Sequence, residues 1–329
     1  MFFLRGVAVS LSVFFLFYAL LSLVVAKGWK AAVALGRERS ERRTADLLFL
    51  ARILPLAAAS LITLLFVVPS FLLLEPRWSE ERLRVLPVVL GTASLVMLAV
   101  GLWNAMKALG RTAHVVRTWR TGAREVGCEA QVPVFCTNPV LTANGVGKEA
   151  PPFAVAGIVR PAVFMSPAAA AALSVAELES VIRHEMAHVQ RRDNLKRLLF
   201  RACAFPFMQG VEHAWADATE AAADDAAVSN TGEALDLAAA LVKLSRLVSS
   251  NPAHAPAGPG NAELTMALLH SGTTVPDRVE RLVAWTAPLP APARSRTSYT
   301  SGLVAAGLFA LLYGPMLAGA HALTELLMQ

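Results

Sequence analysis

Two histidines four residues apart, His184 and His188, are the side chains of this sequence best placed to bind an ion. In a helix these positions lie on one face, about 40° apart, so both imidazoles can reach the same ion. Glu185 follows the first histidine and would stand beside a water molecule at that ion. Hydrolytic zinc sites use three protein ligands and leave one coordination position open. The spacing therefore predicts two metal ligands and a general base.

The third ligand must come from elsewhere in the chain. A third histidine shortly after the pair is excluded, because Arg191 and Asn194 occupy the positions where that pattern needs glycine and histidine. A downstream carboxylate remains, and the alanine-rich segment 211–229, predicted to be helical, offers several. Four of its polar side chains fall within about 60° of one another on such a helix: His213, Asp217, Glu220 and Asp224. An aspartate one turn after a glutamate ligand can accept a hydrogen bond from a histidine ligand, which favours Glu220 and Asp224. For His213 and Asp217 a solvated helix face remains open.

The elements around the histidine pair can also be predicted. Ser174 and Glu177 form a capping box, which begins a helix that we expect to run at least to Asp193. A further helix is expected over about 233–249. Three short apolar runs, punctuated by proline and glycine, are typical of strands: 131–135, 153–158 and 161–165. By analogy with other peptide-binding proteins, the strand at 153–158 could pair with an extended substrate.

Composition indicates a membrane protein. Hydrophobic residues make up 55% of the chain and charged residues 16%, against about 45–50% and 25% in soluble domains. This excludes a disordered chain, and three cysteines are too few for a disulfide scaffold. Four nearly charge-free stretches reach the roughly 20 residues that cross a bilayer: 6–26, 53–74, 85–106 and 297–324. A cleaved signal peptide is disfavoured for the first stretch, because its apolar run is too long and no clear cleavage site follows.

Lysine and arginine set the expected orientation. They gather in 27–48 and in 107–124, and such loops stay in the cytoplasm. Both termini are then outside.

We expect three transmembrane helices in 1–106, a cytoplasmic domain over 107–296, and a fourth transmembrane helix with a short tail in 297–329. The predicted fold is predominantly α, with a zincin-like α+β domain between spans three and four. The net charge of +6 is explained by topology, so no direct nucleic-acid binding is expected.

These motifs resemble a known family. His184-Glu-Met-Ala-His188 followed by Glu220 and Asp224 is similar to the HExxH…ExxxD arrangement of the BlaR/MecR-type membrane metallopeptidases, which are related to the HtpX and CAAX prenyl-protease type. The segment 152–178 also resembles the residues that lead into the zinc-binding helix of that family. The resemblance implies a gluzincin endopeptidase with one Zn²⁺ per chain. It implies His184, His188 and Glu220 as ligands, Glu185 as general base, and Asp224 as the support of a ligand.

A later arginine, Arg278, stands in a segment similar to an arginine motif near the active site of related peptidases. The resemblance implies that it stabilises the oxyanion, contacts substrate, or anchors aspartate or glutamate side chains. A solvated amphipathic helix is the alternative interpretation of the same residues.

The resemblance further implies a role and partners. The substrate would be a protein or peptide, such as a transcriptional repressor or the protein itself, cut in signal-responsive proteolysis at the cytoplasmic membrane of a bacterial-type cell. The β-lactam sensors of the family carry a penicillin-binding domain after the last span, whereas only 325–329 follows here, so direct antibiotic sensing is not expected. A protease working inside the lipid is disfavoured by Arg183 and by the charged run 190–193. A catalytically idle receptor or scaffold remains open.

Overall fold

The computed structural model describes residues 2–34, 40–75, 84–127, 132–137, 141–142, 145–146, 152–250, 265–267, 274–286 and 299–328. The chain divides into two compact units. The first comprises Met1–Gly28, Ile53–Val100 and Pro288–Gln329, and the second comprises Trp29–Arg52 and Gly101–Ala287.

Long apolar helices make up the first unit and extend into the second. They are α1 (Phe2–Ala34), α2 (Glu41–Ile62), the π-helical turn η1 (Thr63–Val67), α3 (Val68–Leu74), α4 (Val85–Arg120) and α11 (Tyr299–Met328). Among the described residues, three stretches are long and apolar enough to cross a membrane: Phe2–Ala34, Glu41–Leu74 and Val85–Arg120. Each contains one predicted span and extends beyond it into a basic segment. The fourth predicted span, 297–324, falls largely on α11, and its crossing of the membrane stays a prediction.

A proline explains the irregular turn between α2 and α3. Pro69 has no N–H, so it cannot donate to the carbonyl of Leu65, four residues earlier. The Val68 N–H bonds instead to the Thr63 carbonyl, five residues back. The Tyr313 hydroxyl of α11 donates to the Leu65 oxygen at 3.1 Å. A side chain from a distant helix thus supplies a donor where proline withdraws one.

A small mixed sheet organises the second unit. Its strands are β1 (Arg124–Val126), β2 (Val134–Cys136), β5 (Phe153–Ala156), β6 (Ala162–Met165) and β7 (Thr265–Ala267), in the order β1-β2-β6-β5-β7. In the described part of the chain, the β2–β6 pairing is parallel and the other pairings of this sheet are antiparallel. The strands β3 (Leu141–Thr142) and β4 (Gly145–Val146) form a separate antiparallel pair.

The three predicted strands correspond to β2, β5 and β6. The expectation that the strand at 153–158 pairs with substrate is wrong, because β5 lies between β6 and β7 and both of its edges are already paired. The sequence does not predict β1, because Arg124 and Glu125 prevent an apolar run there, or β7, because its residues Thr-Met-Ala show no alternation.

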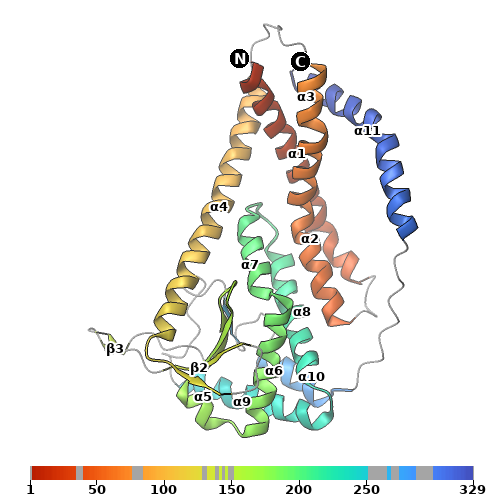
Figure 1. The fold of residues 1–329 in the computed structure, drawn as a ribbon. Coiled ribbons are helices and arrows are strands. Elements are labelled where there is room, and N and C mark those ends of the chain that lie inside the picture. Colours follow the sequence, from red (N-terminus) through yellow and green to blue (C-terminus); the bar gives the residue numbers. More distant parts are fainter. Residues whose placement is uncertain are drawn as a thin grey trace. The chain divides into compact units, whose positions relative to one another are not determined.

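Helices cover both faces of the sheet, and α4 covers one of them. The helices that lie wholly within this unit are α5 (Pro167–Ala172), α6 (Val175–Arg191), α7 (Asp193–Ala202), α8 (Gln209–Ala227), α9 (Thr231–Ser250) and α10 (Val275–Val283), drawn in Figure 1. Phe153, Val155 and Val163 pack with Val181 of α6 and Leu241 of α9 in the main core. On the other face, Trp119 near the end of α4 packs on Phe164.

The helix that carries the histidine pair begins as predicted and ends earlier. The capping box of Ser174 and Glu177 is formed in both directions. The predicted extension to Asp193 is wrong, because Arg192 has φ 54° and separates α6 from α7. This left-handed residue reverses the chain, and Asp193 then begins α7 as a buried side chain.

The Tyr313 contact gives a test of the packing between α11 and η1. Tyr313→Phe should lower the free energy of unfolding by about 0.5–1.5 kcal/mol, because one interhelical hydrogen bond is lost. Denaturation of the detergent-solubilised protein measures this loss.

Pro69→Ala supplies the control. Alanine restores an N–H that can reach the Leu65 carbonyl, so Tyr313→Phe should be less destabilising in that background. Equal losses in both backgrounds would contradict the assignment of Tyr313 as the replacement donor.

Candidate metal centre

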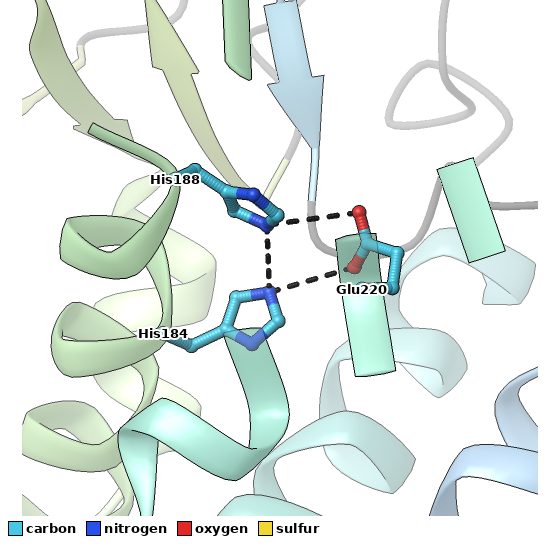
Figure 2. Close-up of side chains that lie close together, drawn as sticks. All are labelled: His184, His188 and Glu220. Atoms are coloured by element: carbon cyan, nitrogen blue, oxygen red, sulfur yellow. Dashed lines mark hydrogen bonds and ion pairs between the residues drawn. The ribbon is translucent and has the colours of Figure 1, made fainter. Parts of the chain in front are cut away.

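Three side chains from two helices converge on one point. His184 and His188 come from α6, and Glu220 comes from α8, which packs beside it (Figure 2). The two histidine Nε2 atoms lie 3.2 Å apart. Glu220 Oε2 is 3.5 Å from His184 Nε2, and Glu220 Oε1 is 3.7 Å from His188 Nε2. All three side chains are buried, and one ligand atom from each lies within 4.8 Å of the others.

Each histidine has a carboxylate behind its other ring nitrogen. His184 Nδ1 lies 3.0 Å from Asp224 Oδ1, and His188 Nδ1 lies 2.9 Å from Asp193 Oδ2. Such partners fix the orientation and tautomer of an imidazole and leave Nε2 free for a metal. Both rings are therefore held with their Nε2 atoms directed at the same space.

Asp193 was missed in the sequence analysis. We took it as part of the end of the helix, yet the reversal at Arg192 turns it back toward His188. Asn194, the next residue, donates to the Gly157 carbonyl at 3.0 Å and so ties this corner to the end of β5. The available signal was an aspartate directly after the helix, but the sign of φ at Arg192 cannot be inferred from an arginine.

The polar stripe of α8 separates into two parts. Glu220 and Asp224 are buried and face the histidines. His213 is exposed and Asp217 is partly exposed, and neither belongs to the cluster that could hold a metal. This is the division that the sequence left open.

Arg278 of α10 anchors the two buried carboxylates of α8. Its side chain is 2% exposed. Its guanidinium lies 3.1 Å from Glu220 Oε2 and donates to Asp224 at 3.0 and 2.6 Å. Arg281, one turn later, donates to Asp225 at 2.7 Å and to Asp224 at 3.2 Å. Of the roles considered for Arg278, the structure shows the anchoring of carboxylates, and its burial excludes a solvated face.

The charges around the cluster shift its pKa values. Burial opposes a charge on His184, but the contacts with Asp224 and Glu220 outweigh burial and raise the pKa of His184 to about 9. Burial also opposes ionisation of Glu220, but Arg278 and the two histidines lower its pKa to about 2. Around neutral pH the site therefore binds a proton at His184 beside the Glu220 carboxylate. A divalent cation would replace that proton, as metals do at histidine ligands.

Glu185 is a buried carboxyl group beside the histidine pair. Both of its carboxyl oxygens lack a hydrogen-bond partner among the described residues. Burial raises the pKa of Glu185 to about 7, against the opposing effect of His184 and His188. A buried polar group without a partner is unfavourable unless water or a ligand meets it. Two imidazoles, one carboxylate and this uncommitted neighbour are a donor set that fits a catalytic divalent metal ion.

Removal of Arg278 tests the charge balance of the site. Arg278→Met should lower the free energy of unfolding by about 3–5 kcal/mol in the metal-free protein, because Glu220 and Asp224 remain buried without their cation. Chemical denaturation of the chelator-treated protein in detergent measures the loss.

Arg281→Met is the matched control. Arg281 contacts the same aspartate, but its side chain is 34% exposed, so water can replace much of what it provides. Its loss should be clearly smaller than that of Arg278→Met. Equal losses would show that Arg278 is not the principal counter-charge.

Comparison with known proteins gives one result. Residues 141–251 match the model of peptidase family M48. The matched range includes α6 and α8, and therefore all three residues of the cluster, Glu185 and both supporting aspartates. No curated protein and no solved structure matches the chain. The match covers about a third of the chain, so residues 141–251 are similar to peptidase family M48, and the buried cluster lies within the matched range.

Proposed function

We propose that this protein is an integral-membrane zinc metalloendopeptidase. The observation that carries the proposal is the convergence of His184, His188 and Glu220 beside a buried Glu185 with two unpaired oxygens. The match to peptidase family M48 supports hydrolysis of peptide bonds. Three candidate spans support residence in a membrane.

His184, His188 and Glu220 would hold the metal. Zinc is favoured because two imidazoles and one carboxylate, with a coordination position left open, are a donor set of hydrolytic zinc sites. When bound, zinc would polarise the scissile carbonyl and make a water molecule more acidic.

Glu185 would move the proton. It follows a ligand directly and is not committed to another side chain among the described residues, so it can accept a proton from water and deliver it to the leaving amine. In the metal-free site burial raises the pKa of Glu185 to about 7, which favours proton uptake by this carboxyl group. Asp193 and Asp224 would keep the imidazoles in place during the reaction.

The proposed biological role follows from the charge distribution and from the family resemblance. The distribution of lysine and arginine favours an active site that faces the cytoplasm in a bacterial-type inner membrane. The resemblance to the BlaR/MecR type favours regulatory cleavage of a protein, such as a repressor or the enzyme itself. The alternative is an idle receptor that keeps the fold, and it is disfavoured because His184, His188 and Glu220 lie together with Glu185 beside them.

Zinc content tests the ligand set. The purified protein should bind about one zinc ion per chain, and Glu220→Ala should lose most of the zinc and the proteolytic activity, because the third ligand is gone. Asp217→Ala, one turn earlier on the same helix, should keep both. Atomic emission and cleavage of an unfolded protein such as casein provide the measurements.

Asp193→Ala extends the same test to the residue that supports His188. It should weaken zinc affinity by about 10–100-fold, as loss of such a partner does. Zinc retained in full by Glu220→Ala, or lost with Asp217→Ala, would show that the ligand set is wrong.

Glu185→Gln separates the base from the ligands. The amide keeps the size of the side chain but cannot accept the proton, so the cleavage rate should fall by at least about 10²-fold while zinc content stays unchanged. Cleavage at the wild-type rate would remove Glu185 from the mechanism. A wild-type protein with full zinc and no cleavage of any tested protein would instead favour the idle receptor.

A pair of topology reporters tests the orientation. A reporter fused after Gln329 should report an extracytoplasmic end, and one inserted at Pro256 should report the cytoplasm. Alkaline phosphatase and fluorescent protein activities distinguish the two sides. The reverse result would place the active site outside the cell.

A further inference from the structure

The loop between α7 and α8, residues 203–208, lies against three helices that lead into the candidate spans. Its carbonyl at Cys203 accepts a hydrogen bond from Arg52 of α2, whose side chain also donates to Glu212 at 2.8 Å. Just before the loop, the Ala202 carbonyl packs so closely on Gly101 of α4 that any Cβ there would collide with it.

The third contact comes just after the loop. A Cβ added at Gly210 would meet the ring of Trp29 on α1 at 3.5 Å. The loop is therefore fixed at both ends to helices α1, α2 and α4, and all of these contacts lie within the second unit. We refer to residues 203–208 as the α7–α8 loop.

The three residues that contact the loop region, Trp29, Arg52 and Gly101, lie at or near the ends of the apolar stretches, where charged residues begin. Arg52 directly precedes the apolar stretch 53–74, and Trp29 lies between Lys27 and Lys30 just after the stretch 6–26. Gly101 lies five residues before Met106, the end of its apolar stretch, which corresponds to about 7.5 Å along the helix. If these helices span the membrane, the loop lies at the boundary between headgroups and acyl chains.

The loop presents an aromatic side chain outward at this level. Phe207 is 74% exposed, while its neighbour Met208 is buried. Phe207 has φ 68°, a backbone conformation that is rare for a bulky residue. Arg201, in the last turn of α7, is exposed on the approach to the loop. An exposed aromatic residue and an exposed basic residue within one short segment are residue types found at membrane interfaces.

We propose that the α7–α8 loop is a lipid-binding element, with the Phe207 side chain among the acyl chains and Arg201 at anionic headgroups. The element rests on the membrane spans and not on the peptidase activity. It joins α7, which begins with Asp193, to α8, which carries Glu220. Contact with lipid would hold the two helices that contribute to the metal centre close to the membrane surface.

A spin label at Phe207 tests the proposal. In a background with Cys128→Ser, Cys136→Ser and Cys203→Ala, Phe207→Cys is labelled with a nitroxide and reconstituted in vesicles of phosphatidylethanolamine and phosphatidylglycerol. Oxygen concentrates in acyl chains, whereas a nickel chelate stays in water. We expect high collision with oxygen and low collision with the chelate. Val159→Cys, at a residue that is 90% exposed in the turn after β5, is the aqueous control.

Two results would overturn the proposal. Equal chelate access at positions 207 and 159 would place Phe207 in water, and low collision with both reagents would place it against protein. If the cysteine-free background fails to fold, Phe207→Trp and Val159→Trp in the wild-type background give a second measurement. Vesicles with lipids brominated along the acyl chains should quench the added fluorescence of Phe207→Trp and leave that of Val159→Trp unchanged, and equal quenching would refute lipid contact.

Discussion

The arrangement around the histidine pair depends on balancing negative charge away from water. Glu185, Asp193, Glu220 and Asp224 are all buried within a short distance of two imidazoles. An uncompensated buried carboxylate is strongly unfavourable, so cations must be brought to it. Arg278 arrives from α10, 54 residues beyond Asp224 in the sequence, and contacts two of the four groups. α10 is held by these ion pairs and by the packing of Leu282 in the core, and a divalent metal would supply the remaining positive charge.

Contacts within the second unit fix the positions of α6 and α8, the two helices that carry the candidate metal ligands. α6 lies on the sheet through Val181, and α8 packs beside α6. Asn194 ties the corner after α6 to the backbone at Gly157, where the positive φ of 99° suits glycine. The sheet therefore acts on the site indirectly, by fixing where α6 ends and in which direction Asp193 faces.

Local pattern predicted the parts of the structure that depend on local interactions. The capping box, the helix of the histidine pair and the four-residue spacing follow from helix geometry, and three apolar stretches appeared as candidate spans. The pairing of Asp193 with His188 was not predictable, because it depends on the left-handed backbone of one arginine. The partners of Arg278 and the strands β1 and β7 depend on contacts between distant parts of the chain. The spacing of apolar and polar residues in a single sequence does not reveal which distant segments will be in contact.

The left-handed backbone conformation of Arg192, between α6 and α7, limits which residues at this position are compatible with the geometry of the candidate metal centre. An L-residue in that conformation carries about 1–2 kcal/mol of steric strain, which glycine avoids and asparagine tolerates better than most residues. β-branched residues are the least tolerated there, because their Cβ substituents crowd the backbone. Substitution at this position should therefore be tolerated for small residues and not for valine or isoleucine, and the contact of Arg192 with the His188 carbonyl is made by its backbone N–H. This conformation thus makes backbone shape, and not side-chain chemistry, the property that selection must preserve at this point of the chain.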